Sequence, residues 1–154
     1  MKKIISKSFY FEAAHKLNTT ENEENKNIHG HSYFVEVFVI DYNDQISKKG
    51  LILDFSIFNE RINIVKKKLD HRFLNEIDGL ENPTLENIGL YIYNKLKKLD
   101  LCLYKILIKR KSCGETFMST FDEDLFLKGL ELIIQKLKVV CSKSLLKISA
   151  RSFD

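Results

Sequence analysis

An alternating segment from His31 to Asp41 constrains the fold more than any other part of the sequence. Its apolar and aromatic residues recur at every second position, at Tyr33, Val35, Val37 and Val39. Successive side chains of a strand point to opposite faces of a sheet, so this pattern predicts a strand with one buried face. The aromatic character of the stretch from Ile4 to His15 predicts a strand before it. The polar residues 18–27 predict the loop that joins the two strands.

Capping residues and apolar periodicity predict two helices after this hairpin. The first begins with Ser56 as its N-cap and runs to about Leu69. The second has Asn82 as its N-cap and Pro83 at its first position, where the missing N–H costs nothing. Its apolar residues recur at helical spacing, at Leu85, Ile88, Ile92 and Leu96.

Three further elements complete the predicted fold. Short strands are predicted at Leu51 to Phe55 and at Leu103 to Lys109, and a third amphipathic helix at Asp122 to Val140. Together these elements predict an α+β fold, in which an antiparallel sheet carries helices on one face.

Size and composition limit the class of protein. The 154 residues fit a single domain, and the net charge of +4 is too small to favour nucleic acid as a partner. The N-terminus has no apolar core of a signal peptide, and no run approaches the roughly 18 apolar residues of a membrane span, so no membrane partner is expected. Three cysteines without paired spacing favour a reducing compartment, and we expect a cytoplasmic protein.

The chain has four histidines, and three of them fall at the predicted hairpin. His29 and His31 are two residues apart and point to the same face of a strand, while His15 ends the preceding strand. If the strands pair antiparallel, all three side chains meet at one end of the sheet. Three neutral nitrogen ligands suit Zn²⁺ and leave a fourth position for water or substrate, as in catalytic zinc sites. The spacing alone is equally compatible with three surface or capping histidines.

Several ordered segments resemble one known family. Phe11 to His15 and Ile28 to Tyr33 resemble the zinc motifs of the 6-pyruvoyl-tetrahydropterin synthase and 6-carboxytetrahydropterin synthase family. Leu51 to Phe55 resembles its next strand, and Leu69 to Asn75 resembles its catalytic Asp-His element. Leu80 to Asn87 resembles the start of its Asn-Pro-Thr helix. The resemblance runs from about residue 3 to about residue 120.

The resemblance implies a tunnelling fold, in which sheets of several subunits join around a pore, usually as a homohexamer of two stacked trimers. It implies 7,8-dihydroneopterin triphosphate as the substrate, bound where subunits meet. Zn²⁺ would hold the hydroxyls of the three-carbon side chain and acidify the adjacent carbon-bound protons. The expected product is 6-carboxytetrahydropterin, for queuosine-type deazaguanine biosynthesis, or 6-pyruvoyl-tetrahydropterin.

The resemblance also assigns roles to single residues. His71 is the expected proton shuttle, and Asp70 would fix its tautomer and stabilise its charged form. Glu115, which Thr116 follows, is the expected pterin anchor, because a carboxylate can accept two parallel hydrogen bonds from the pterin. Thr84 of the Asn-Pro-Thr element is the second expected substrate-binding residue.

One position departs from the family. The family places a catalytic cysteine four residues before the first histidine of His-Gly-His, and this chain has Asn25 there, whose amide cannot act as a base. A carboxylate of the same loop is one substitute: Glu24 is adjacent, with Glu23 and Glu21 nearby. Relatives with a glutamate near this position cleave the side chain to 6-hydroxymethyl-dihydropterin, for folate.

The absence of this cysteine is compatible with two more hypotheses. Cys113 could reach the site from the late strand, or the protein is a pterin-binding subunit without the usual chemistry.

We expect residues 1–120 to form the tunnelling-fold domain and residues 121–154 to add a C-terminal helical extension to it. That extension packs on the sheet or a neighbouring subunit, or its basic end helps to hold triphosphate or contacts a partner.

Overall fold

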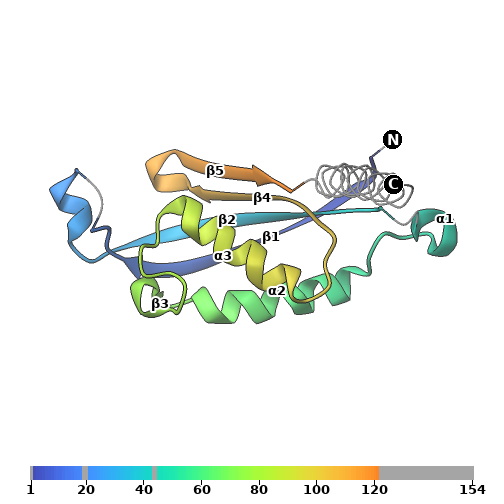
Figure 1. Ribbon diagram of the computed structural model, residues 1–154, viewed down its shortest axis with the longest axis horizontal. Coiled ribbons are helices and arrows are strands. Elements are labelled where there is room, and N and C mark those ends of the chain that lie inside the picture. Colours follow the sequence, from blue (N-terminus) through green and yellow to red (C-terminus); the bar gives the residue numbers. More distant parts are fainter. Residues whose placement is uncertain (1, 19–20, 43–44, 122–154) are drawn as a thin grey trace, which may run out of the picture. The chain divides into compact units, whose positions relative to one another are not determined.

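The computed structural model describes residues 2–18, 21–42 and 45–121, which form a five-stranded sheet with helices (Figure 1). The sheet order is β3-β1-β2-β4-β5. Its strands are β1 (Ile4–His15), β2 (His29–Ile40), β3 (Arg72–Phe73), β4 (Leu103–Arg110) and β5 (Glu115–Thr120). The predicted strands at 4–15, 31–41 and 103–109 are confirmed to within two residues at each end, and the α+β class is confirmed.

Three features of the sheet differ from the prediction. The sheet is mixed, because β3 pairs with β1 in parallel through Ala13 and Arg72, whereas β1–β2, β2–β4 and β4–β5 are antiparallel. The strand β5 was not predicted from the sequence. The predicted strand at Leu51 to Phe55 is wrong, because Asp54 ends that segment as a helix cap and Phe55 is already helical.

The helices are α1 (Gln45–Lys49), α2 (Phe55–Leu69) and α3 (Leu85–Lys97). The N-cap of α2 is Asp54 and not Ser56: the Asp54 carboxylate accepts hydrogen bonds from the Ser56 backbone and hydroxyl. The N-cap of α3 is Thr84 and not Asn82, because the Thr84 hydroxyl accepts from the Asn87 backbone N–H. Both corrections move the cap by two residues and leave the helix in place.

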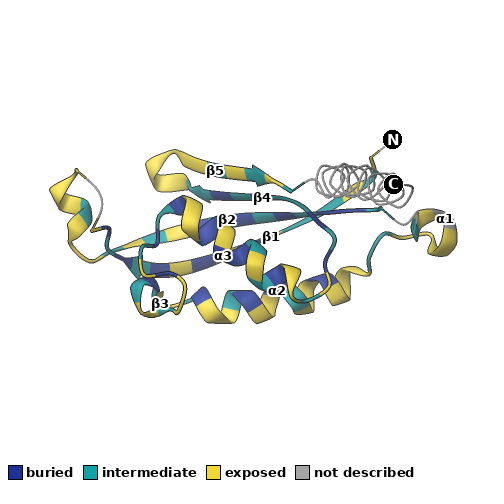
Figure 2. Cartoon of the chain, viewed as in Figure 1, coloured by how far each residue is buried: buried dark blue, intermediate teal, exposed yellow. Residues whose placement is uncertain are grey.

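The helices α2 and α3 lie on the same face of the sheet (Figure 1). The buried sheet residues of that face include the alternating series Tyr33, Val35, Val37 and Val39 together with Phe9, Phe11, Ile106 and Ile108. They pack against the apolar stripes of the helices, at Phe58, Ile62, Val65, Ile88, Ile92 and Leu96. Figure 2 shows this burial along the strands and along the inward sides of both helices. One apolar face per element therefore accounts for the core.

No described helix covers the other face of the sheet. Its aromatic residues are partly exposed, with Tyr10 at 50%, and lysine side chains lie over them. Lys111 Nζ lies 4.8 Å from the Phe34 ring centroid, and Lys105 Nζ lies 4.0 Å from that of Phe38. We call this surface the open face.

The described residues up to Phe121 belong to one compact unit. The predicted third helix at Asp122 to Val140 and the predicted extension from residue 121 lie almost entirely outside the described residues, so the domain division stays a prediction. Within the described part of the chain, none of the helices has the length and apolar character required to cross a membrane.

Candidate metal centre

Three histidines meet at the end of the β1–β2 hairpin. His15 is the direct cross-strand partner of His29, and His31 pairs with Ala13. All three side chains point to the helix-facing side of the sheet, and one nitrogen from each lies within 4.8 Å of the others. The ring centroids are 4.5 to 5.1 Å apart. The predicted convergence of the three histidines is confirmed.

Hydrogen bonds fix which ring nitrogen of His15 and His29 faces the centre. His15 Nδ1 lies 2.9 Å from the Pro83 carbonyl oxygen, and His29 Nδ1 lies 2.8 Å from that of Asn27. A carbonyl oxygen can only accept, so each Nδ1 carries a proton and donates it. Both Nε2 atoms therefore keep their lone pairs, as a metal ligand requires.

His31 reaches the same tautomer by a different route. Its Nε2 lies 3.1 Å from Arg110 Nη1, which can only donate. Its Nδ1 lies 3.7 Å from the Cys113 sulfur, the hydrogen-bond acceptor that remains for the Nδ1 proton. All three histidines thus present an Nε2 lone pair to one point.

Burial and positive charge keep His15 and His31 neutral. The pKa of His15 is lowered to about 4, chiefly by burial and also by the neighbouring His29, His31 and Arg110, while the hydrogen bond to Pro83 opposes the shift. The pKa of His31 is likewise lowered to about 4, chiefly by burial and also by Arg110 and His29. His29 Nε2 is buried and has no hydrogen-bond partner among the described residues. A buried acceptor without a partner is costly, and a metal ion would satisfy it.

Asp70 and His71 lie where α2 ends, and backbone contacts with β1 hold them. The Glu12 backbone N–H donates to Asp70 Oδ1 at 3.0 Å, and the His71 N–H donates to the Glu12 carbonyl at 2.6 Å. His71 takes a left-handed backbone conformation, with φ of 56°, and its side chain is 81% exposed. Its Nε2 lies 4.0 Å from Asp70 Oδ1, which is an ionic contact rather than a hydrogen-bonded dyad.

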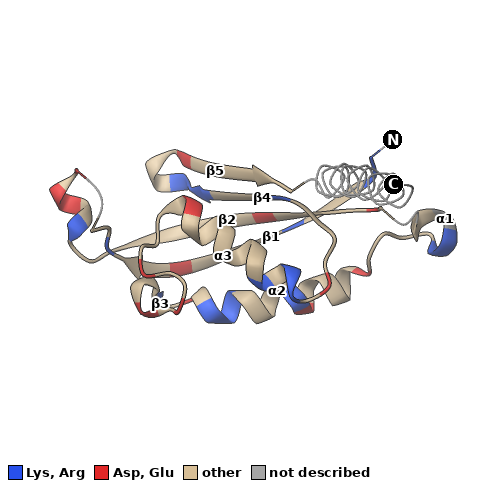
Figure 3. Ribbon diagram, in the orientation of Figure 1, with Lys and Arg blue, Asp and Glu red and all other residues tan. Residues whose placement is uncertain are grey.

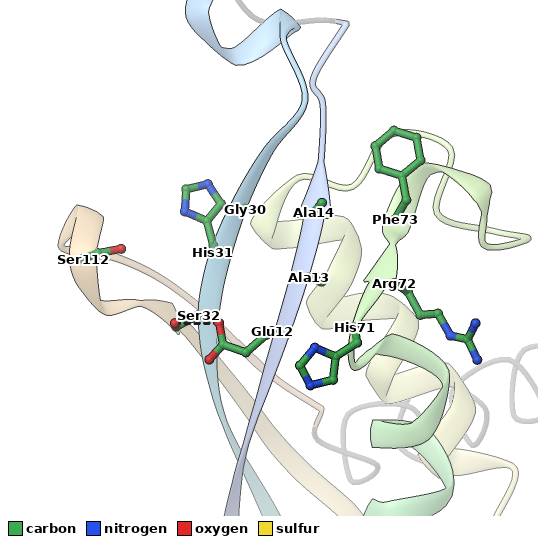
Figure 4. Close-up of a pocket in the computed structure, with 10 residues that line it drawn as sticks. All are labelled: Glu12, Ala13, Ala14, Gly30, His31, Ser32, His71, Arg72, Phe73 and Ser112. Carbon is green, nitrogen blue, oxygen red and sulfur yellow. Dashed lines mark hydrogen bonds between the residues drawn. The ribbon is translucent and has the colours of Figure 1, made fainter.

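One cavity is lined both by His71 and by His31 of the three-histidine site. It has a volume of about 640 Å³, and His31, His71, Glu12 and Ser32 are among its lining residues. Figure 4 shows the Ser32 hydroxyl bonded to the Glu12 carboxylate, at 2.7 Å, with the His71 ring beside Glu12. The structure thus places the predicted proton shuttle on the same cavity as one predicted metal ligand.

Glu115 and Thr84 line a different cavity, of about 550 Å³, together with Arg110 and Thr116. The Glu115 carboxylate forms an ion pair with Arg110, and the Thr84 hydroxyl caps α3. Both predicted substrate-binding residues therefore already have protein partners in this chain.

The loop before His29 contacts the residues after β1 through a backbone carbonyl, and the carboxylate expected to act as a base is exposed. Its short 3-10 helix η1 spans Glu23–Lys26, and Glu24 is exposed (Figure 3 colours the acidic positions of this loop red). The Glu24 backbone N–H donates to Asn22 Oδ1, and the Glu24 carbonyl accepts the Asn27 N–H. Asn25 accepts the Leu17 N–H through its carbonyl oxygen. Among the candidate substitutes for the cysteine, Cys113 has the contact with a site histidine.

Sequence reasoning missed two residues of the site. Arg110 reaches the histidines because it ends β4, where Tyr33 is its cross-strand partner. Glu12 stands one residue out of phase with Ala13 and so faces the open side. Glu12 could have been found from the Phe-Glu-Ala-Ala-His segment that resembles the family. Arg110 could have been found as a basic residue at the end of an apolar strand.

The fold and these contacts define a class: an α+β domain whose hairpin end holds a three-histidine site suited to a metal ion. A family model described as 6-pyruvoyl tetrahydropterin synthase matches residues 4–117, which is more than half of the chain. The chain therefore belongs to the 6-pyruvoyl tetrahydropterin synthase family, whose members are pterin synthases.

Similar proteins carry two different descriptions. A 6-carboxy-5,6,7,8-tetrahydropterin synthase of Synechocystis is 40% identical over 100 residues, covering 62% of this chain and 75% of the relative. A dihydroneopterin monophosphate aldolase of Pyrococcus furiosus is 41% identical over 88 residues, covering 57% of this chain and 69% of the relative. The fold matches the 6-pyruvoyl tetrahydropterin synthase of Caenorhabditis elegans, with a TM-score of 0.66 and 24% identity over 79% of this chain and 97% of that one.

Proposed function

We propose that this protein is a zinc-dependent lyase that converts 7,8-dihydroneopterin triphosphate and water to 6-carboxytetrahydropterin, with release of triphosphate and acetaldehyde. The observation that carries the proposal is the convergence of three Nε2 lone pairs, one of them buried without a partner, in a member of a pterin synthase family. The Synechocystis relative supports this product over 6-pyruvoyl-tetrahydropterin.

The site fits Zn²⁺ by the chemistry of its donors. His15, His29 and His31 would hold the ion through Nε2, and each Nδ1 is anchored, as is usual for metal-bound histidine. When bound, Zn²⁺ supplies Lewis-acid polarisation of substrate oxygens and so raises the acidity of neighbouring C–H and O–H bonds.

The chain's own residues would move the protons. His71 is exposed on the shared cavity, where its imidazole could pass a proton to or from the substrate as a general acid or base. Glu12 and Asp70 position it, since Asp70 accepts the Glu12 N–H and Glu12 accepts the His71 N–H. Glu24, the base expected from the sequence, would have to turn from solvent towards the site to take part.

A second candidate function is side-chain cleavage to 6-hydroxymethyl-dihydropterin, and one observation favours it. Asn25 stands where the family has its cysteine, and the amide cannot remove a carbon-bound proton. Aldol cleavage starts instead from a hydroxyl proton, which is far more acidic than a C–H proton and needs a weaker base. The Pyrococcus furiosus aldolase, at 41% identity, supports this alternative.

We also propose that the active protein is a homohexamer of two trimers. The open face carries exposed Tyr10 and Met118, and among the described strands β5 has only β4 as a neighbour, so its other edge can pair with a strand of another subunit. Light scattering would show six chains per particle, and Met118→Lys would shift the protein towards smaller species. A monomeric wild-type protein would contradict the assembly.

Incubation of zinc-loaded protein with 7,8-dihydroneopterin triphosphate or monophosphate, followed by mass spectrometry, tests the proposed function. 6-Carboxytetrahydropterin supports the first candidate, and 6-hydroxymethyl-dihydropterin supports the second. His71→Ala, which leaves the three zinc ligands in place, is the control for turnover at this site. Substrate binding without turnover would overturn both and identify the protein as a pterin-binding subunit.

A further inference from the structure

We propose that Arg110 competes with the metal ion for the histidine nitrogens, and that Glu115 relieves this competition by drawing the guanidinium away. The inference rests on the metal binding that the proposed function requires. It concerns how strongly this chain would bind its metal ion. The family motifs identified in the sequence assign no such role to Arg110 or Glu115.

The guanidinium of Arg110 uses the lone pairs that a metal would use. Its Nη1 lies 3.1 Å from His31 Nε2 and 3.4 Å from His15 Nε2. Since guanidinium can only donate, each of these contacts engages a histidine lone pair. A lone pair that accepts an N–H cannot at the same time bind a metal ion.

The position of Arg110 prevents it from simply pointing into water. Its side chain is only 13% exposed, and its Nε is buried without a hydrogen-bond partner. It ends β4 opposite Tyr33 and therefore faces the helix side of the sheet with the histidines. A fixed positive charge beside the site also repels a divalent cation, the more so because the surroundings are partly buried.

Glu115 gives the guanidinium a second set of contacts. It is the cross-strand partner of Arg110 in the β4–β5 hairpin, and its Oε2 forms an ion pair with Arg110 Nη2. Nη1 and Nη2 belong to one rigid planar group. The same arginine is therefore held between two histidine nitrogens and one carboxylate, and a stronger hold by Glu115 frees the histidines.

This arrangement predicts opposite effects on zinc affinity when Arg110 or Glu115 is replaced by neutral glutamine. Arg110→Gln removes the competing charge, and we expect it to bind Zn²⁺ about 10-fold more tightly. Glu115→Gln removes the restraint on Arg110 and also a negative charge near the site, and we expect weaker binding by a similar factor. In the double variant the effect of Glu115→Gln should shrink, because the arginine through which it acts is gone.

The experiment measures zinc affinity directly, by competition with a chromogenic chelator. Wild type, the two single variants and the double variant are compared with Lys109→Gln, which removes a positive charge from the adjacent residue on the opposite face of β4. Arg110→Ala provides a second variant if the glutamine itself bonds to a histidine. Circular dichroism verifies that each variant is folded.

The outcomes separate this inference from the proposed function. Tighter binding by both Arg110 variants, with Lys109→Gln close to wild type, supports the competition. Equal or weaker binding by folded Arg110 variants overturns it, even where wild type binds zinc and is active. If wild type binds no zinc but the Arg110 variants do, the competition stands and the zinc enzyme is overturned. If none of the variants binds zinc, both proposals fail.

Discussion

His15 Nδ1 donates to the Pro83 carbonyl across 68 positions of the sequence, at 2.9 Å. This bond joins the end of β1 to the turn that precedes α3, and it directs the His15 Nε2 lone pair to the centre. Pro83 thus has a different role from the first helical position predicted for it. The backbone carbonyl of the Asn-Pro-Thr segment positions His15, and the helix begins two residues after Pro83.

Acid should destabilise the metal-free protein well above the pH at which carboxylates titrate. The pKa values of His15 and His31 fall from 6.5 to about 4 on folding, so the unfolded chain binds more protons below about pH 6.5. Stability should therefore be full above about pH 6.5 and should fall as the pH drops towards 4.

Denaturant unfolding of chelator-treated protein at about pH 7.5 and about pH 5 measures this effect. The carboxyl groups with lowered pKa values, Asp54 and Glu81, titrate below this window. His31→Gln should reduce the pH dependence of the free energy of unfolding. Equal stability at both pH values would contradict the buried, neutral state of these histidines.

Removal of the Cys113 thiol should weaken metal binding through His31. The sulfur is the acceptor that remains for His31 Nδ1, at 3.7 Å, and loss of such a partner typically costs about 10-fold in metal affinity. Cys113→Ala should show a loss of up to this size, and Cys113→Ser should recover most of it. Cys102→Ala, at the other described cysteine, is the control, and a matching loss there would contradict the assignment.

At position 71 we expect histidine to be required for activity, although its backbone conformation lowers stability. Its φ of 56° disfavours any residue with a side chain, by roughly 1 kcal/mol, and glycine adopts it freely. We expect His71→Gly to unfold at a higher temperature than His71→Ala, while both lose turnover and keep their metal. Thermal denaturation and the turnover assay test this together, and His71→Gly that unfolds before His71→Ala would argue against the strained conformation.

The contact between α3 and β5 depends on a glycine. A Cβ at Gly89 would lie 2.7 Å from the Phe117 ring, whereas a Cβ at Gly30 would meet the Ala13 carbonyl at an ordinary 3.7 Å. Gly89→Ala should therefore lower the free energy of unfolding by about 1 kcal/mol, since the overpacking outweighs the better helix propensity of alanine. Gly30→Ala is the matched control and should be nearly neutral in the same urea titration.

The elements with strong periodicity could be predicted from the sequence, and the irregular contacts could not. Apolar alternation predicted β2, and aromatic character predicted β1. Antiparallel pairing of the two strands then predicted that the three histidines meet at one end of the hairpin. The strand β5 is short and largely exposed, and pairing with β4 defines it. Leu51 to Phe55 has the apolar content of a strand, and Asp54 converts its end into a helix start.

The surroundings of the histidines depended on distant pairings. Arg110, Cys113 and Glu115 come together with His31 through the β2–β4 and β4–β5 registers, which no local motif specifies. Likewise, the contact between His71 and Glu12 requires the parallel pairing of β3 with β1. The resemblance supplied residue roles, and the structure supplied the partners that modify them.

The most direct test of the three-histidine centre is the metal content of the protein, purified without chelator and measured by inductively coupled plasma mass spectrometry. We predict about one Zn²⁺ per chain in wild type, and close to none in His29→Ala, which removes the buried Nε2 that has no partner among the described residues. Wild-type protein that stays metal-free after incubation with Zn²⁺, or a folded His29→Ala that retains a full equivalent, would contradict the three-histidine centre.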